Sequence, residues 1–191
     1  MAFEDPTASK NNPDPVEEIK SREVLVETLN TPLETVRVEE IKEIDKQVFT
    51  AEMALPAEIV DAYLANPRSI LTVLKDREGH LVGYVVADPL ENAFNDLLAH
   101  DNEIELLPNT VYVESIAILP KYRSLKNLNS LLKESISRAR EQGYQAITMH
   151  TRTTNGLSNA LQKRWGAEFK RRIDNWYGLG EPFDYLVIKL S

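Results

Sequence analysis

The chain has 191 residues, no cysteine, 27% charged residues and a formal net charge of −8. This length fits one domain of ordinary size, and the lack of cysteine excludes disulfides, thiolate metal sites and a cysteine nucleophile. No apolar run is long enough to span a membrane, and the first residues lack the basic start and apolar core of a secretory signal. We therefore expect a soluble, cytoplasmic protein.

Glycine is scarce and charge is unevenly spread. The chain has seven glycines, with none between Gly83 and Gly143, which excludes the glycine-rich phosphate loops of common nucleotide-binding folds. Residues 121–172 hold twelve Lys or Arg against three Asp or Glu, a net of +9, which leaves −17 for the rest. The overall sign disfavours a nucleic-acid partner. The basic segment indicates either an anionic ligand or a solvated helix face.

The first residues predict a tail, a strand and a helix. Residues 1–20 hold three of the ten prolines and almost no large apolar side chains, so we expect a flexible tail before a single domain over 21–191. Residues 23–29 alternate in the manner of a strand. Thr31-Pro32 places a capping hydroxyl before a proline at a first helical position, and apolar residues at helical spacing predict a helix from there to Phe49.

The remaining elements alternate between helical and strand patterns. They are a helix over 56–65, strands over 69–75 and 81–88 joined by a turn, a short helix over 90–100, a strand over 110–119, an amphipathic helix over 125–142, a strand over 146–151, a helix over 156–165, and strands over 169–177 and 183–190. This order predicts a mixed α/β sheet with helices on both faces.

Two segments in this order carry sequence motifs. LPKYRSLKNLNSLL follows the fourth predicted strand, and TNGLSNALQKRWGAEF follows the fifth. Together they resemble the GNAT superfamily of acyl-CoA-dependent N-acetyltransferases over about residues 23–190. The Arg123 segment fits the family's R/Q-x-x-G-x-G/A phosphate loop, and the spacing of Asn155 and Gly166 fits its second motif. The resemblance implies a GNAT-like fold with a six- to seven-stranded mixed sheet, acetyl-CoA as acyl-donor cosubstrate, and no metal.

The resemblance also implies a coenzyme A site at the end of the fourth strand and the start of the helix that follows. A helix start offers unpaired backbone N–H groups and a positive dipole end to phosphate. In the family a backbone N–H near Ile118 polarises the thioester carbonyl. The residues expected to bind the cofactor are Ala117, Ile118, Arg123, Ser124, Leu125, Lys126, Asn127, Leu128, Asn155 and Gln162.

The chain departs from the family pattern at three of these positions. Lys126 and Leu128 stand where the family has two glycines, and Gln162 stands where many members have a tyrosine that protonates the leaving thiolate. Lys126 either replaces lost phosphate contacts with its charge or occupies the phosphate site. Because an amide does not titrate, Gln162 cannot serve as a general acid. Tyr177 is the substitute candidate, with a packed strand tyrosine as the alternative.

Glu114 is the candidate general base. It lies where many relatives keep a carboxylate that acts through water, and an ammonium with a pKa near ~10 must lose a proton before it attacks a thioester. Strand alternation places Glu114 on one face with Tyr112, Ile116 and Ile118. If that face is inward, burial raises the pKa of Glu114 into a range useful for a base. The alternative is a glutamate at an edge or a solvent face.

Two further groups of titratable residues have simpler interpretations. His80, His100 and His150 are far apart with no ligand partners at metal spacing, so we expect turn or surface residues. An acidic rim attracts a cationic amine, although ordinary surface acidity explains the same residues. The rim consists of Glu91, Asp96, Asp101, Glu103 and Glu105.

Two functions from different classes follow. The first is an enzyme that moves an acetyl or short acyl group from acyl-CoA to a primary amine on a protein N-terminus, a lysine or a small molecule. The second is a catalytically weak or inactive domain of the same fold that acts as a binding or regulatory module. For either we expect a monomer or homodimer with no nucleic-acid or membrane partner.

Overall fold

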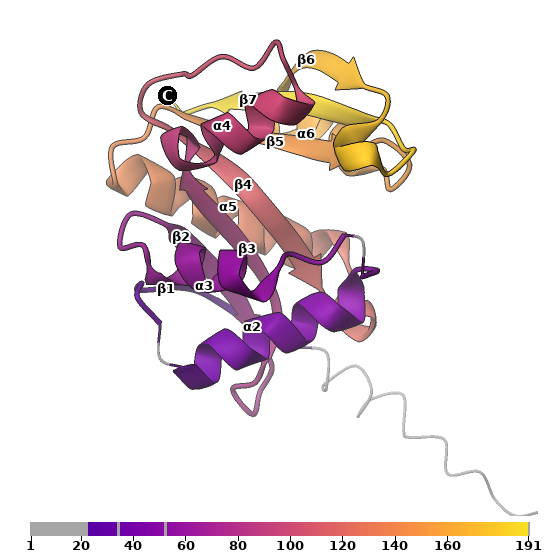
Figure 1. Cartoon of the computed structure of the whole chain (residues 1–191). Helices are drawn as coiled ribbons and strands as arrows, with labels where there is room; N and C mark the ends of the chain where they lie inside the picture. The colour runs from indigo at the N-terminus through magenta and orange to yellow at the C-terminus, as the bar shows by residue number, and fades with distance from the viewer. Residues whose placement is uncertain (1–22, 34, 52, 191) are drawn as a thin grey trace, which may run out of the picture.

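The computed structural model describes residues 23–33, 35–51 and 53–190, so the predicted tail over 1–20 lies outside them. The described chain forms a seven-stranded mixed sheet with helices on both faces, which confirms the predicted fold class (Figure 1). The elements are β1 (Leu25–Leu29), α2 (Thr35–Val48), α3 (Ala57–Ala65), β2 (Ile70–Lys75), β3 (Leu81–Pro89), α4 (Leu90–His100), β4 (Thr110–Ile118), α5 (Leu125–Glu141), β5 (Ala146–Arg152), α6 (Leu157–Trp165), β6 (Glu168–Ile173) and β7 (Phe183–Lys189), with short 3-10 turns at Pro120–Tyr122 and Trp176–Gly178.

The sheet is antiparallel except at one pair of strands. The strand order is β1-β2-β3-β4-β5-β7-β6, and only β4 and β5 pair in parallel. Their pairing covers three residues of each strand and stops at Tyr112 and Thr148. Both strands continue for several residues beyond this point, and Figure 1 shows them running apart. The sheet is therefore open between the carboxyl halves of β4 and β5.

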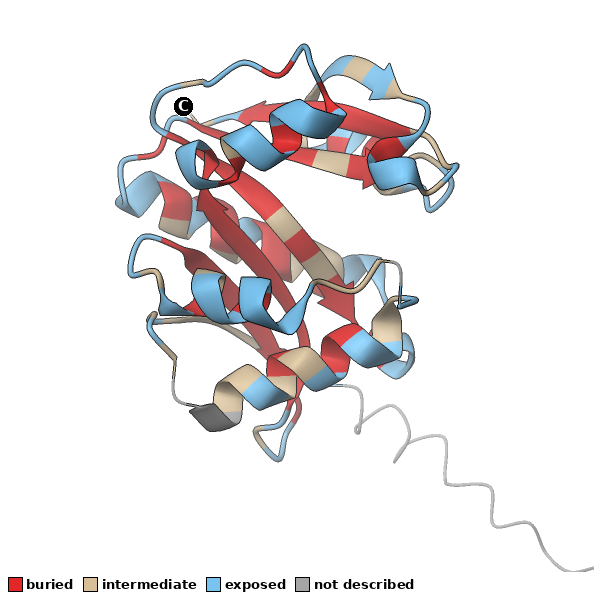
Figure 2. Cartoon of the chain, in the orientation of Figure 1, coloured by how far each residue is buried: buried red, intermediate tan, exposed pale blue. Residues whose placement is uncertain are grey.

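Three buried clusters hold the layers together. The largest joins one face of the sheet to α5 and α6 through Leu131, Ile136 and Leu161. On the opposite face, α2 and α3 pack over β2 and β3, and α4 packs beside Trp176 and Tyr185. Figure 2 shows the strands buried and the outer sides of the helices exposed. Alternation of apolar residues along each element produces this layering.

The helix start predicted at Thr31-Pro32 is wrong. Helix α2 begins at Thr35, and the Thr31 hydroxyl donates a 2.7 Å hydrogen bond to the Asn66 carbonyl oxygen at the end of α3. The Leu33 amide likewise donates to the Leu64 carbonyl. The segment before α2 is therefore held by the end of α3, a tertiary contact that local capping rules do not include.

The strand predicted over 169–177 is too long. Strand β6 ends at Ile173, and Tyr177 lies in the 3-10 turn that follows. Its backbone has φ 50°, in the left-handed region that a strand cannot contain. The Asn175 side chain stabilises the turn by accepting a 2.7 Å hydrogen bond from the Gly180 amide.

Within the described residues, no helix is long and apolar enough to cross a membrane.

Candidate active site

A bulge in β4 sets the position of Glu114. In the pairing of β3 with β4, Val86 faces Ser115 and Ala87 faces Val113, so Glu114 is the extra residue. A bulge places two consecutive residues on the same side of a strand. Val113 packs into the core beneath α5, as Ile116 and Ile118 do, which leaves Glu114 and Ser115 for the opposite face.

This bulge corrects the predicted strand face. Glu114 shares its face with Tyr112, as predicted, but Ile116 and Ile118 lie on the other face of the sheet. Simple alternation fails because it assumes no extra residue between Tyr112 and Ile116. The consequence is that Glu114 points toward α3 and α4 rather than into the apolar layer beneath α5.

The Glu114 carboxyl is buried and incompletely satisfied. Its Oε1 atom is inaccessible to solvent and has no hydrogen-bond partner among the described residues. Burial raises the pKa of this carboxyl to about 8; a hydrogen bond with Tyr63 lowers the pKa, and the nearby charges of Asp88 and Asp96 raise it. Near neutral pH such a group exchanges a proton readily, as a general base requires.

A polar network links β4, β5 and β6 beside Glu114. The Tyr112 hydroxyl lies 3.1 Å from Nδ1 of His150, and Nε2 of His150 lies 3.2 Å from Oδ2 of Asp101. Arg171 reaches both Asp101 oxygens, with Nε donating at 2.8 Å to Oδ1. Burial opposes ionisation of Asp101, but the bonds from His150 and Arg171 outweigh it and lower its pKa to about 2.

The surface position expected for His150 is wrong. Its side chain is 0% exposed, and its ring stacks on Trp176 with centroids 3.7 Å apart. Burial lowers its pKa more strongly than Asp101 raises it. His80 is exposed in the β2–β3 turn as expected, and His100 is exposed at the end of α4, where its ring stacks on Tyr177.

Tyr177 approaches the same region from the turn after β6. Its side chain is 43% exposed, and its hydroxyl donates a hydrogen bond to the Asp96 carboxylate on α4. Burial and this carboxylate raise the pKa of Tyr177, with a smaller contribution from Glu114. The phenol therefore stays protonated at neutral pH, and it lies close enough to Glu114 for the charge of that carboxylate to raise its pKa.

The loop after β4 is organised by its own side chains. Nε of Arg123 donates a 3.0 Å hydrogen bond to the Ile118 carbonyl, which ties the loop to the end of the strand. The Ser124 hydroxyl caps α5 by accepting from the Asn127 amide at 3.1 Å. Asn127 is buried, and its side chain donates to the Tyr122 carbonyl. These bonds fix the start of α5 as a preformed turn.

The residues that replace the family's glycines point in different directions. Leu128 is half-buried and packs against the core beneath α5. Lys126 is exposed and has no hydrogen bond or ion pair within the described residues. Leu125 is 53% exposed, and Ala117 is buried on the α2 face. Leu128 is thus explained by packing, while Lys126 leaves a cation at the first turn of α5.

Asn155 lies just before α6, and Gln162 lies within that helix. The Asn155 side chain accepts a 2.9 Å hydrogen bond from the Leu157 amide, a local turn at the helix start. Gln162 donates to the Ser158 hydroxyl at 3.0 Å, and that hydroxyl donates to the buried Asp184 carboxylate at 2.6 Å. Both side chains therefore have structural partners within the chain.

The predicted acidic rim consists mostly of ion-paired or exposed residues. Asp101 is paired with Arg171, and Glu91 with Arg68. Glu103 and Glu105 are exposed in the loop after α4. Of the rim, only Asp96 contributes to the electrostatic environment of Glu114.

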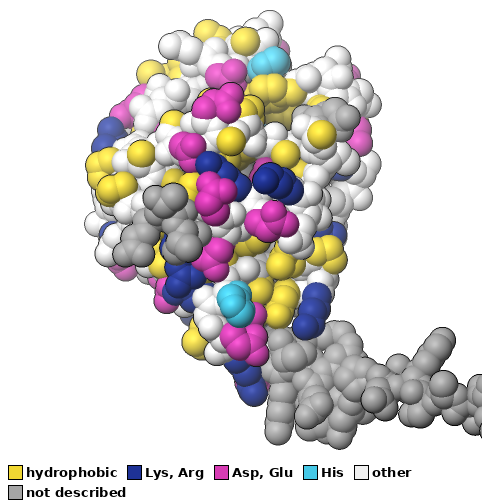
Figure 3. Space-filling view, turned by 60° about the horizontal axis from the view of Figure 1, so that its bottom comes forward, with side chains coloured by type: hydrophobic (Ala, Val, Ile, Leu, Met, Phe, Trp, Pro, Cys, Tyr) yellow, Lys and Arg dark blue, Asp and Glu magenta, His cyan; other side chains and the backbone are white. Residues whose placement is uncertain are grey.

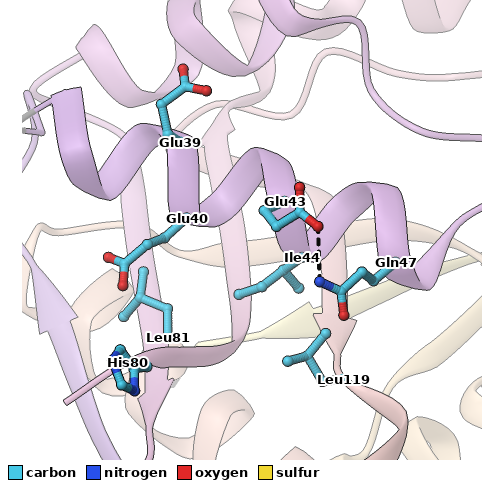
Figure 4. A pocket seen from close by; sticks show the side chains of 8 residues that line it. All are labelled: Glu39, Glu40, Glu43, Ile44, Gln47, His80, Leu81 and Leu119. Carbon is cyan, nitrogen blue, oxygen red and sulfur yellow. Dashed lines mark hydrogen bonds between the residues drawn. The ribbon is translucent and has the colours of Figure 1, made fainter. Parts of the chain in front are cut away.

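A separate groove lies along α2. Figure 4 shows Glu40 and Glu43 of the helix on the side of the apolar residues Ile44, Leu81 and Leu119; the full lining is Glu39, Glu40, Glu43, Ile44, Gln47, His80, Leu81 and Leu119. Its three glutamates already interact with Lys42, Arg37 and Gln47 respectively. Figure 3 shows acidic and basic side chains interspersed over this face. Two of the three glutamates are therefore paired with a cation, and Glu43 accepts from the neutral amide of Gln47.

The β2–β3 turn brings three possible metal ligands together. Side-chain atoms of Asp76, Glu78 and His80 lie within 4.8 Å of one another, which local sequence spacing did not indicate. Glu78 and His80 are exposed, and Asp76 caps the turn by accepting from the amides of Glu78 and His80. These bonds account for Asp76 without an ion.

Comparison with protein families gives a match over most of the chain. Residues 37–167 match the model described as the acetyltransferase (GNAT) family. The chain belongs to the GNAT acetyltransferase family. A search of curated proteins gave no match.

Solved structures share this GNAT fold at low sequence identity. The ribosomal-protein-S18-alanine N-acetyltransferase from Escherichia coli superposes with a TM-score of 0.66 at 14% identity, over 87% of this chain and 95% of that chain. NAA60 from Arabidopsis thaliana in complex with acetyl-CoA gives 0.66 at 16% identity, over 88% and 99%. A chain of the NatC complex bound to Gag peptide and CoA gives 0.68 at 14%, over 88% and 99%. At these identities the likeness concerns the fold.

Sequence reasoning missed several residues of this GNAT domain that surround Glu114. Tyr63 lies on α3 and lowers the pKa of the Glu114 carboxyl, whereas Asp88, near the end of β3, raises it. Four consecutive buried residues precede His150 on β5, and a strand buried on both faces could have indicated that His150 is buried too. No local pattern marks Tyr63, because its role depends on how α3 packs on the sheet at β3.

Proposed function

We propose that this GNAT domain is an N-acetyltransferase that moves an acetyl or short acyl group from acyl-CoA to a primary amine by direct attack on the thioester. The observation that carries the proposal is the buried Glu114 carboxyl, with a pKa of about 8, beyond the point where β4 and β5 stop pairing. The Escherichia coli structure of the same fold is a ribosomal-protein-S18-alanine N-acetyltransferase, which supports an amine acceptor.

In this proposal Glu114 takes a proton from the acceptor ammonium, directly or through water. The neutral amine then attacks the thioester carbonyl carbon, and a carbon–nitrogen bond forms. A backbone N–H near Ile118 stabilises the oxyanion. The carbon–sulfur bond breaks, and coenzyme A leaves as a thiolate. The attacking nitrogen loses its second proton, and the thiolate takes up a proton to give the free thiol. The products are an amide, coenzyme A and one proton.

Acyl-CoA would bind at the start of α5. Amide groups in the first turn of a helix and the positive end of its dipole favour phosphate. The exposed Lys126 adds a cation there, and the bond from Arg123 to the Ile118 carbonyl joins this site to the end of β4. When bound, the cofactor supplies the activated acyl group.

Tyr177 remains a candidate acid for the leaving thiolate. Its phenol is protonated at neutral pH because burial and Asp96 raise its pKa. Its hydroxyl proton is directed at Asp96, so transfer to a thiolate would require that bond to break. Gln162, engaged with Ser158, offers no titratable group.

A binding or regulatory module is the second candidate. The observation in its favour is the combination of Lys126 in place of a glycine and Gln162 in place of an acid. Such a module would bind coenzyme A or an amine with little turnover.

Calorimetric titration with acetyl-CoA, followed by assays of thiol release over a panel of amines, distinguishes the two. The enzyme proposal expects binding and amine-dependent thiol release that the Glu114→Gln variant loses and the matched Glu103→Gln variant keeps. Binding without thiol release would support the module. No binding at millimolar ligand would exclude the acyl-CoA site.

A further inference from the structure

A buried carboxylate on α2, Asp45, bonds to two other elements of the fold. Its Oδ2 atom accepts a 2.9 Å hydrogen bond from the Leu55 amide, shortly before α3 begins. Its Oδ1 atom accepts a hydrogen bond from the Tyr84 hydroxyl on β3. Asp45 is only 2% exposed, so water does not compete for these bonds. The two oxygens therefore tie α2 both to the start of α3 and to the sheet.

Tyr84 extends this connection to the β4 bulge. Its hydroxyl lies 3.1 Å from Oγ of Ser115, and both side chains are buried. Ser115 follows Glu114 in the bulge and lies on the same side of the strand. A bulge interrupts the regular ladder of backbone hydrogen bonds. The bond to Ser115 therefore restrains the backbone that carries Glu114.

Helix α3 carries the tyrosine that contacts Glu114. Tyr63 lies on this helix, and its hydroxyl donates a hydrogen bond to the Glu114 carboxylate. The start of the helix follows Leu55, whose amide is held by Asp45. Its far end is held separately, because the Asn66 side chain after α3 donates a 2.7 Å hydrogen bond to the Asp88 carboxylate. The position of Tyr63 therefore depends on anchors at both ends of α3.

These contacts form a closed path that begins and ends at Glu114. In order, the path passes through Ser115, Tyr84, Asp45, Leu55 and Tyr63. One half runs through the sheet to the bulge, and the other half runs along α3. Asp45 joins the two halves, because one oxygen bonds to each. Connected hydrogen bonds of this kind act together in a buried environment.

The charged groups around Glu114 do not include Asp45. The titratable groups that influence Glu114, or that its charge influences, are Tyr63 on α3, Asp88 on β3, Asp96 on α4, Tyr112 on β4 and Tyr177 in the turn after β6, while His150 on β5 lies beyond Tyr112. Asp88 and Asp96 are the charges that raise the pKa of Glu114. A change at Asp45 therefore reaches Glu114 through the position of its neighbours rather than through charge.

We propose that Asp45 is a positioning residue for acetyl transfer, which keeps Tyr63 in contact with Glu114 by holding the start of α3 and the β4 bulge at the same time. This inference rests on the proposed acetyltransferase function. The bond from Tyr63 favours the ionised form of Glu114, which is the form that acts as the base. Loss of Asp45 should therefore make Glu114 harder to ionise.

The test measures the ionisation of Glu114 in two ways on the full chain. NMR of protein labelled at the glutamate carboxyl carbons gives the pKa of Glu114, whose resonance is the one absent from Glu114→Gln. The second readout is the midpoint of the pH dependence of kcat/KM for amine-dependent thiol release from acetyl-CoA. We expect Asp45→Ala to raise both values by about 0.5–1 pH unit, because the contact with Tyr63 is lost.

A double-mutant cycle separates positioning from a general loss of stability. If Asp45 acts through Tyr63, the double variant Asp45→Ala/Tyr63→Phe should have the same Glu114 pKa as Tyr63→Phe alone. Asp45→Asn keeps an acceptor for the Leu55 amide and should keep the wild-type pKa of Glu114. The matched control is Asp184→Ala at another buried acid, on β7. It should lower Tm without moving that pKa.

Each outcome supports or overturns the proposal. If Asp45→Ala does not fold, Asp45→Leu removes the acceptor while filling its space, and the same shift is expected. An unchanged Glu114 pKa in the folded variant would overturn the proposal, and so would shifts of Asp45→Ala and Tyr63→Phe that add. A shifted pKa by NMR with no thiol release from any amine would instead overturn the proposed function, and with it a catalytic purpose for Asp45.

Discussion

The Tyr112 hydroxyl lies 3.1 Å from Nδ1 of His150 and joins β4 to β5 at the point where their backbone pairing ends. Behind this bond, His150, Asp101 and Arg171 continue a polar chain to β6. The side chains therefore hold together two strands whose backbones separate. These contacts link the two diverging strands beside Glu114. They also give the buried Asp101 charge its cationic partner, Arg171.

Arg171→Ala should destabilise the protein, because it leaves Asp101 buried without its cation. We expect a loss of roughly 2–3 kcal/mol in the free energy of unfolding at pH 7, measured by urea denaturation. Asp101 has a folded pKa of about 2, below its ordinary 3.8, so its stabilisation is present above pH 4 and is lost as the pH falls toward 2. The difference in the free energy of unfolding between wild type and variant should narrow over that interval.

The matched control is Lys170→Ala, at an exposed residue, which should change the free energy of unfolding by less than about 0.5 kcal/mol. A loss in Lys170→Ala equal to that in Arg171→Ala would contradict this prediction.

Glu114→Gln should reduce activity and raise stability at alkaline pH. Loss of a general base lowers kcat/KM by about 10²–10⁴-fold. The folded pKa of about 8 exceeds the ordinary 4.5, so ionisation of Glu114 costs stability as the pH rises from 4.5 to 8. The variant should therefore be more stable than wild type by about 2 kcal/mol or more at pH 8.5, with little difference at pH 5. Chemical denaturation at both pH values measures the difference in the free energy of unfolding. A variant that is less stable than wild type at both pH values would contradict the raised pKa of Glu114.

The pH dependence of kcat/KM should report the Glu114 carboxyl. Activity should rise with pH around a midpoint near 8, since the deprotonated form is the base. Tyr63 lowers this pKa by hydrogen bonding, so Tyr63→Phe should shift the midpoint upward. Tyr144→Phe removes a hydroxyl that bonds to the distant Arg68 carbonyl and should leave the midpoint in place. A downward shift in Tyr63→Phe would contradict the assigned contact.

Lys126→Ala should weaken binding of acetyl-CoA. Loss of one charged phosphate contact corresponds to about a 10-fold increase in Kd by calorimetry. Lys133 is exposed on the same helix, α5, and Lys133→Ala serves as the matched control with unchanged Kd. Tighter binding in Lys126→Ala would instead mean that the lysine obstructs the phosphate.

Gly83→Ala should destabilise the sheet beside the thioester site. A Cβ at this position would lie 2.9 Å from the Ala117 carbonyl oxygen and 3.2 Å from Cγ1 of Ile118. Strands β3 and β4 would have to separate there, at a cost of about 1–3 kcal/mol. Chemical denaturation measures the loss, and calorimetry should show weaker binding of acetyl-CoA. Unchanged stability would mean that the strands adjust freely.

Most element boundaries could be predicted from the sequence because they follow local rules. Helix α4 over Leu90–His100 agrees with its predicted range, and α5 begins at Leu125 as predicted. The failures lie where a tertiary contact overrides a local pattern. Thr31 bonds to the end of α3 rather than capping a helix, and the turn at Tyr177 replaces the end of a strand.

By itself the sequence determined the order of strands and helices and the family motifs, because hydrophobic periodicity and helix termini are encoded over a few neighbouring residues. The resemblance to the family's phosphate loop also marked Lys126 and Leu128 as departures, but only packing showed that Leu128 belongs to the core. The surroundings of Glu114 were decided by the tertiary structure. One extra residue in β4 reverses the face of a side chain, and residues far apart in sequence then determine its charge environment.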